Sequence, residues 1–130
     1  MIVQGNEVGE WVSKKVNGLW IPQGSIALGL VKEKEIIAGC IFDNYCINSI
    51  RSTLAIEGRI NREFIRAILD YPFNFLKVNC IINTVSSFNT KSMKLTEHFG
   101  FKRVATIPLA MPDGGDMIIY SLVKKDCVRI

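Results

Sequence analysis

Residues 54–63 read Leu54-Ala55-Ile56-Glu57-Gly58-Arg59-Ile60-Asn61-Arg62-Glu63, an apolar segment that ends at a glycine and leads directly into a polar segment. The first part continues a strand predicted over Ser49–Glu57, and Asn61 is a residue type that caps the start of a helix. The first N–H groups of a helix have no partner inside it and can bind an anion. With Arg59 and Arg62 beside them, this turn predicts a phosphate site. The alternative, a simple turn with solvated arginines, stays equally open, because one glycine is too few for a Walker loop or a dinucleotide fingerprint.

Upstream of this turn, the pattern predicts one helix and two further strands. Val8, Trp11, Val12 and Val16 recur at spacings of three and four, which places them on one face of a helix over residues 7–16. Two β-rich segments follow, at residues 25–31 and 35–43, and a charged turn separates them. Together with the strand at residues 49–57, they form an antiparallel meander.

Downstream, the hydrophobic period changes to that of helices. A helix starts at Asn61 and is expected to kink at Pro72 or to split there into two segments, a strand covers residues 78–85, and a second helix runs from Asn89 to Gly100. Two closing strands, at residues 101–110 and 116–124, flank the turn residues 112–115. This order predicts an α+β fold with α/β/α layers and a mixed, mostly antiparallel central sheet of about six strands with flanking helices.

Composition limits the class of protein. The chain has 130 residues, of which 48% are hydrophobic and 22% charged, and its net charge is +4. This length fits one domain over residues 1–130, and the hydrophobic content excludes a disordered or collagen-like chain. The absence of a long apolar run or a signal peptide predicts a cytoplasmic protein without a membrane span. The four cysteines, scattered without a Cys-x-x-Cys pair, predict buried thiols and no metal site.

A second informative segment reads Asn89-Thr90-Lys91-Ser92-Met93-Lys94-Leu95-Thr96-Glu97-His98-Phe99-Gly100-Phe101-Lys102. It resembles the Asn-x-x-Ser/Ala-x-x-Leu…Gly-Phe signature of the GNAT acyl-CoA N-acetyltransferases. Tyr71-Pro72-Phe73 is similar to the helix end in the branch with the ribosomal-protein N-terminal acetylases, and residues 112–122 resemble the closing hairpin of short bacterial and phage members. The resemblance covers residues 25–127 and implies central strands that splay apart.

The resemblance implies that acetyl-CoA is bound in the gap between the strands at residues 49–57 and 78–85. The main-chain N–H of Ala55 or Ile56 would polarise the thioester carbonyl, and Asn89 and Ser92 would line the pantetheine arm. The pyrophosphate would meet the N–H groups of residues 58–63, although the second glycine of the family's turn is absent here. The expected cofactor residues are Ala55, Ile56, Glu57, Gly58, Arg59, Ile60, Asn61, Arg62, Asn89 and Ser92.

The resemblance also implies candidate catalytic residues. Besides Ile56, these are Thr96 and Tyr120. Thr96 stands where the family often has a tyrosine that protonates the departing thiolate; a threonine hydroxyl is a poor acid, so either it only hydrogen-bonds the sulfur or another group, Tyr120 or Tyr45, acts. Asp43, Glu57 and Asp116 are candidate bases, each also explained as an ordinary exposed acid. Trp20, Asp43 and Tyr45 are the residues expected to bind the acceptor. For Trp20, packing in the core is an equally open alternative.

These observations predict an N-acetyltransferase that transfers an acetyl group from acetyl-CoA to an amine by direct attack in a ternary complex. The acceptor could be a protein N-terminus, a small amine or a modified nucleotide, and the enzyme could be a homodimer in a bacterial cytoplasm or, if phage-encoded, that of the host. Two alternatives stay open: a GNAT-fold acyl-CoA-binding module with little or no turnover, and a small basic nucleic-acid adaptor.

Overall fold

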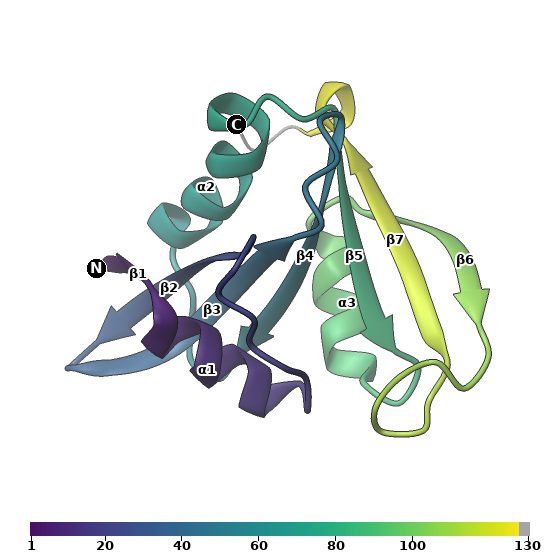
Figure 1. Ribbon diagram of the computed structural model, residues 1–130, viewed down its shortest axis with the longest axis horizontal. Helices are drawn as coiled ribbons and strands as arrows, with labels where there is room; N and C mark the ends of the chain where they lie inside the picture. Colours follow the sequence, from purple (N-terminus) through teal and green to yellow (C-terminus); the bar gives the residue numbers. More distant parts are fainter. Residues whose placement is uncertain (128–130) are drawn as a thin grey trace.

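The computed structural model contains one seven-stranded sheet in the order β1-β2-β3-β4-β5-β7-β6, and the structure describes residues 1–127 (Figure 1). Neighbouring strands run antiparallel except for β4 and β5, which are parallel, so the predicted mixed and mostly antiparallel α+β sheet is confirmed. The elements are β1 Ile2–Gln4, α1 Asn6–Lys15, β2 Ile26–Lys32, β3 Glu35–Asp43, β4 Ser49–Ile56, α2 Arg62–Asp70, a π-helical turn Tyr71–Phe75, β5 Cys80–Ser86, α3 Thr90–His98, β6 Lys102–Ile107, β7 Met117–Val123 and a 3-10 turn Lys124–Asp126.

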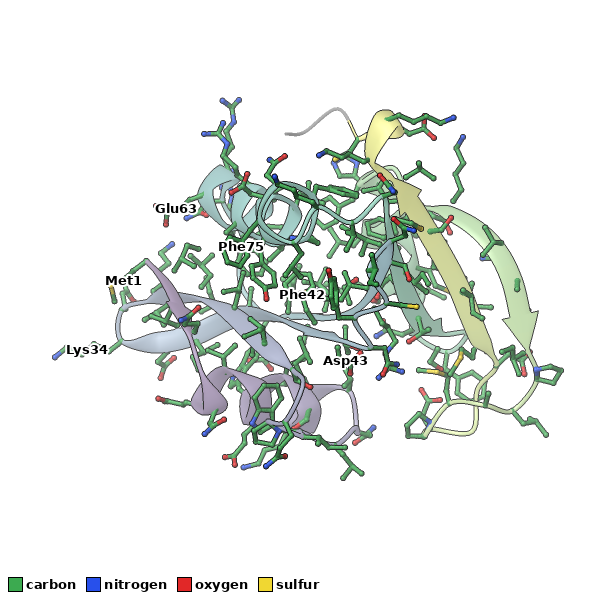
Figure 2. The ribbon with its side chains drawn as sticks, turned by 45° about the horizontal axis from the view of Figure 1, so that its top comes forward. Met1, Lys34, Phe42, Asp43, Glu63 and Phe75 are labelled. Atoms are coloured by element: carbon green, nitrogen blue, oxygen red, sulfur yellow. The ribbon has the colours of Figure 1, made fainter. Side chains whose placement is uncertain are left out.

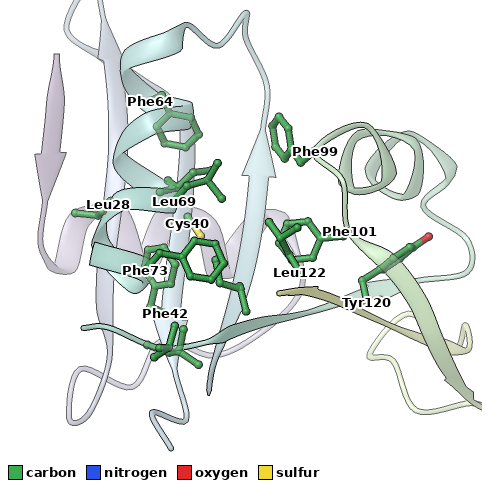
Figure 3. Packing of buried hydrophobic residues seen from close by; sticks show 14 of the residues in the cluster. Leu28, Cys40, Phe42, Phe64, Leu69, Phe73, Phe99, Phe101, Tyr120 and Leu122 are labelled. Carbon is green, nitrogen blue, oxygen red and sulfur yellow. The ribbon is translucent and has the colours of Figure 1, made fainter. Parts of the chain in front are cut away.

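Helices cover both faces of the sheet, with α1 on one face and α2 and α3 on the other (Figure 1). Successive strand residues point to opposite faces, and Figure 2 shows this for Phe42, on the α2 side, and Asp43, on the α1 side. The smaller core cluster joins α1 to the sheet through Val8, Val12, Ala27, Ile41 and Ala55. The larger cluster, part of which is drawn in Figure 3, includes Leu28, Cys40, Phe42, Phe64, Ile68, Leu69 and Phe73.

Three features differ from the sequence prediction or refine it. The sheet has seven strands rather than about six, because Ile2–Gln4 pairs with β2; three residues are too few for a period to be read. The strand predicted to reach Ala110 ends at Ile107, since Pro108 lacks an N–H and Leu109 has a positive φ of 58°. Of the kink or split expected at Pro72, the structure has the split: α2 ends at Asp70 and a π-helical turn follows it.

Candidate functional site

The central feature of the site is the separation of β4 from β5. These strands pair only from Ser49↔Cys80 to Ser52↔Asn83, whereas β4 continues to Ile56 and β5 to Ser86. Over the same length β4 stays paired with β3, and β5 stays paired with β7. The sheet therefore divides into two halves that part like a V, which opens at the lower edge of Figure 1. This confirms the predicted splay of the central strands.

The register of β3 and β4 decides which backbone groups face the gap. The N–H of Glu57 donates to the carbonyl of Ile37 on β3, over 2.8 Å. Backbone groups alternate in direction along a strand, so the N–H of Ala55, two residues earlier, also points toward β3. The N–H groups of Leu54 and Ile56 point to the opposite edge of β4, where β5 no longer pairs with it. Of the two expected N–H donors, Ala55 and Ile56, only Ile56 therefore faces the gap.

Two connected hollows occupy the V. The central cleft, of about 320 Å³, runs through the gap and is lined by Leu54 of β4, by Asn83 to Ser86 of β5, and by the chain that follows α1. The α3 cleft, of about 240 Å³, lies between the end of β4 and the start of α3. Both share Lys15, Val16, Leu54, Asn89 and Ser92, so they form one continuous space.

Five of the expected cofactor residues line the α3 cleft: Ala55, Ile56, Glu57, Asn89 and Ser92. Asn89 also caps α3, because its Oδ1 accepts a hydrogen bond from the N–H of Ser92 over 3.0 Å. The apolar side chains of Val16, Leu54 and Leu95 form much of the remaining wall. An elongated molecule with an apolar arm and a few amide groups fits such a lining.

The turn expected to bind phosphate is built differently. The N–H groups of Glu57 and Gly58 both donate to the carbonyl of Ile37, over 2.8 and 3.1 Å, and are therefore not available as paired donors for an anion. A Cβ on Gly58 would lie 2.9 Å from Cβ of Ile37, so the turn packs directly on β3. Contacts with β3 therefore take up the N–H of Gly58, the first of the residues 58–63 expected to meet the pyrophosphate, while the prediction for the rest of this turn stays a prediction.

The residues after this turn lie outside the two connected hollows. Arg59, Ile60 and Asn61 line a separate hollow of about 300 Å³, together with Met1 and Lys32. Asn61 caps α2, and its Oδ1 accepts from the N–H of Phe64 over 2.9 Å. The structure thus separates Arg59, Ile60 and Asn61 from Asn89 and Ser92, although the sequence analysis had grouped them. Arg62, the first residue of α2, is exposed and lines neither of the two connected hollows.

All three expected acceptor residues, Trp20, Asp43 and Tyr45, line a further hollow. This side groove, of about 810 Å³, opens on the α1 side and joins the central cleft through shared residues, Asp43 and Arg51 among them. Trp20 lies over Gly9 of α1 and donates from Nε1 to Oδ1 of Asn6 over 3.1 Å. The tryptophan is therefore both packed on α1 and part of the groove wall.

The charge of Asp43 is compensated by Arg51. The guanidinium donates from Nε to Oδ1 and from Nη2 to Oδ2, each over 2.8 Å. The hydrogen bonding that Arg51 donates to Asp43 raises the pKa of Arg51 above its ordinary value, so the arginine stays charged. β3 and β4 place the two residues opposite each other, in the register Asp43↔Arg51. The pair is a fixed polar group between the central cleft and the side groove.

Two of the expected catalytic side chains are not presented to the cleft. Thr96 is buried, and its Oγ1 accepts from Nδ2 of Asn83 over 3.1 Å. The ring of Tyr120 is fully buried, and its hydroxyl donates to Oε2 of Glu97 over 2.6 Å. Burial, and next this hydrogen bond, raise the pKa of Tyr120. In Figure 3 the Tyr120 hydroxyl is directed away from Phe42 and Phe73. Tyr120 lies on the face of β7 that packs under α3, and Glu97 of α3 accepts the hydrogen bond from its hydroxyl.

Several cleft residues were missed by the sequence analysis. Lys15 ends α1 and forms an ion pair with Glu57, while Lys91 stands in the first turn of α3; both line the α3 cleft. Asp113 lines the central cleft, and its Oδ1 accepts from Ser86 Oγ over 2.8 Å. Lys91 and Asp113 lie inside segments that carry the resemblance, but no role was predicted for either, and Lys15 reaches the cleft only through the packing of α1. Within residues 1–127, no helix is long and apolar enough to cross a membrane.

Comparison with solved structures identifies the fold. The N-acetyltransferase PseH from Campylobacter jejuni, in complex with acetyl coenzyme A, superposes with a TM-score of 0.62 and 20% identity over 78% of this chain and 69% of that chain. The ribosomal-protein-S5-alanine acetyltransferase from Vibrio fischeri gives a TM-score of 0.68 and 19% identity, over 81% of this chain and 64% of that chain. A GNAT-family acetyltransferase from Bacillus anthracis gives a TM-score of 0.63 and 21% identity, over 89% of this chain and 72% of that chain.

This chain thus spans about two thirds of the length of these three structures. No protein-family profile matches the sequence, and no curated protein matches it.

Proposed function

From the premise that the chain has the fold of the GNAT N-acetyltransferases, we propose that it transfers an acetyl group from acetyl-CoA to an amine in a ternary complex. The observation that carries the proposal is the parting of β4 and β5 after four residue pairs, with a continuous cleft in the gap. A fold alone does not imply a function, so the argument rests on this cleft and on its residues.

The acyl donor would be held with its pantetheine arm in the α3 cleft, where Asn89 and Ser92 supply polar contacts and Leu54 and Leu95 apolar ones. In this position the N–H of Ile56 points at the gap and donates to the thioester oxygen as it gains negative charge. This donor belongs to the backbone of a paired strand, so it is held in place before the donor arrives.

The amine acceptor would approach from the side groove, which meets the central cleft at Asp43 and Arg51. The acceptor enters the open groove in its ammonium form and loses a proton to water there before the amine attacks, with the Asp43–Arg51 pair as the polar wall at this junction. The new C–N bond replaces the C–S bond, the nitrogen gives its surplus proton to water, and the departing thiolate takes a proton from water. A thiol ionises near pH ~8.5, so this leaving group needs little assistance.

The test of this proposal has two stages. Acetyl-CoA at about 100 times its Kd should raise the free energy of unfolding by about 2.7 kcal/mol, which appears as a higher Tm. Thiol release is then followed with a panel of amines, in a Cys46→Ser background that removes the exposed cysteine. A Tm unchanged by acetyl-CoA contradicts the proposal. A raised Tm without thiol release from any amine indicates a binding module without turnover.

A further inference from the structure

The side groove has an apolar lining that stays open to solvent. Leu19, Ile21 and Tyr45 line it although they are 85%, 57% and 52% exposed. Trp20 and Pro112 belong to the same lining. Exposed apolar side chains that gather around one hollow mark a surface that binds an apolar group. The groove therefore suits an amine that is carried on an apolar body.

The charges of the side groove cancel. Among the described residues that line it, Asp43 is the one carboxylate and Arg51 the one cation. They bind each other through two hydrogen bonds of 2.8 Å, so no carboxylate of the lining is left to pair with an ammonium group. Each ammonium group of a polyamine needs such a partner when it leaves water. The groove therefore does not match a polyamine, but it matches a molecule whose own charges also cancel.

The guanidinium of Arg51 has donors that Asp43 does not use. A guanidinium has five N–H donors in a fixed fork, and Arg51 gives one from Nε and one from Nη2 to Asp43. Within residues 1–127, no acceptor is bonded to its Nη1, and the side chain is 38% exposed. Arg51 lines both the side groove and the central cleft, so these donors can serve a molecule that lies where the two meet. A carboxylate fits such a fork best.

We propose that the acceptor is a small amino carboxylic acid with an apolar body, and that Arg51 binds its carboxylate. The inference rests on the proposed function, because it names the substrate class of the same site. The apolar body lies against Trp20 and its apolar neighbours, and the amine points along the central cleft toward Leu54, which the central and α3 clefts share. Asp43 holds one side of the guanidinium in place while the other end binds the carboxylate. The product is the N-acetyl amino acid.

The first test compares amino acids with their own carboxamides. Thiol release from acetyl-CoA is measured in the Cys46→Ser protein with L-phenylalanine, β-homophenylalanine and ε-aminocaproate, which differ in the distance between amine and carboxylate. At least one acid should exceed its carboxamide in kcat/KM by about 10-fold, the effect of one charge-assisted hydrogen bond. Carboxamides or spermidine that react as efficiently as the best acid would overturn the inference.

The second test removes the proposed partner of the carboxylate. Arg51→Gln should abolish the preference for the acid over its carboxamide, and this ratio does not depend on how much total activity the variant keeps. The matched control Arg66→Gln removes the same charge from an exposed position of α2, which covers the other face of the sheet, and should leave the ratio unchanged. A preference that persists in Arg51→Gln would overturn the assignment.

The apolar part of the groove has its own pair of variants. Leu19→Ser should raise KM for the best acid several-fold, because the exposed leucine no longer covers the apolar body. Val104→Ser, a change of the same kind at an exposed position of β6 outside the groove, should leave KM unchanged. Equal KM values in both variants and the wild type would contradict the placement of the apolar body.

Product binding gives a readout that does not need turnover. In the presence of CoA, the N-acetyl derivative of at least one of the three acids should bind about 10-fold more tightly than its carboxamide, and this difference should vanish in Arg51→Gln. Calorimetry measures both Kd values, and equal values in the wild type would overturn the inference. If this preference is found but no amine releases thiol, the proposed transfer reaction fails. If only amines of other classes release thiol, the acceptor class fails and the transferase proposal stands.

Discussion

The Nδ2 of Asn83 on β5 donates a hydrogen bond to the Oγ1 of Thr96 on α3, over 3.1 Å, and both side chains are buried. Asn83 also lines the central cleft and is the last β5 residue that pairs with β4. The pair therefore ties α3 to the strand at the point where the gap begins. This hydrogen bond gives Thr96 a structural role, whereas the resemblance had suggested that its hydroxyl contacts the sulfur of the departing thiolate.

Thr96→Val should lower the free energy of unfolding by about 1–3 kcal/mol, because the buried amide of Asn83 loses its acceptor. Thr96→Ser keeps the hydroxyl and should cost less. Urea unfolding measures both. At saturating acetyl-CoA, kcat of Thr96→Val and its pH profile should match the wild type. A large fall in kcat with Thr96→Val, but not with Thr96→Ser, would assign the hydroxyl to the thiolate instead.

The backbone direction of β4 predicts a pattern of amide exchange. The N–H groups of Leu54 and Ile56 face the open gap and should exchange rapidly, whereas Ala55, directed at β3, should be protected. Acetyl-CoA should slow exchange at Ile56 more than at Ala55. Hydrogen exchange followed by NMR, with and without acetyl-CoA, measures these rates. Strong protection of Ile56 in the free protein would contradict the assignment of its N–H to the gap.

The contact of Trp20 with α1 predicts an effect on the acceptor. A methyl group at Gly9 would overlap the Trp20 ring, so Gly9→Ala should move the ring off α1 and change the wall of the side groove. We expect a red shift of Trp20 emission in a Trp11→Phe background and a raised KM for the amine. Gly18→Ala is the control, because its Cβ would lie 3.4 Å from Val16 Cγ2. Unchanged emission in Gly9→Ala would show that the ring accommodates the methyl.

The hydrogen bonds of Asp113 predict that the stability of the folded protein depends on pH in the acid range. A hydrogen bond from the N–H of Gly115, and then one from Ser86, lower the pKa of its carboxyl in the folded protein. Because the folded pKa lies below the unfolded value of about 3.9, the stabilisation is present above that value and is lost as pH falls through the folded pKa. The Tm difference between wild type and Asp113→Asn should therefore be largest near pH 6 and shrink toward pH 3. A difference that stays constant over this range would show that Asp113 does not contribute through its charge.

The cysteines should differ widely in reactivity. Burial raises the pKa of the Cys40 thiol far above its ordinary value, whereas Cys46 is exposed. The thiolate is the reactive form, so Ellman's reagent should modify Cys46 first and Cys40 only after unfolding. Cys80 and Cys127 are partly buried and should react slowly. Cys46→Ser should remove the fast phase, and a fast phase that persists in this variant would contradict the assignment.

Much of the secondary structure could be predicted because its signals are local. Asn61 and Asn89 cap the helices that they were expected to cap, and Glu35–Asp43 is a strand over the predicted residues. Strand β1 could not be predicted in this way, since three residues carry no period and it forms only where β2 offers an edge. The parting of β4 and β5 was anticipated only through the family resemblance.

The amino-acid sequence by itself determined the helices, the strands and the residues at the start of α3, because capping, periodicity and turn chemistry act between near neighbours. Only the tertiary structure decided that the Ile37 carbonyl accepts hydrogen bonds from the N–H groups of Glu57 and Gly58. It also decided that Glu97 accepts from the Tyr120 hydroxyl, and that Lys15 pairs with Glu57, 42 positions away in the chain. These partners are set by strand register and helix packing. The residues next to a hydrogen-bond donor in the sequence do not determine which distant acceptor it will pair with.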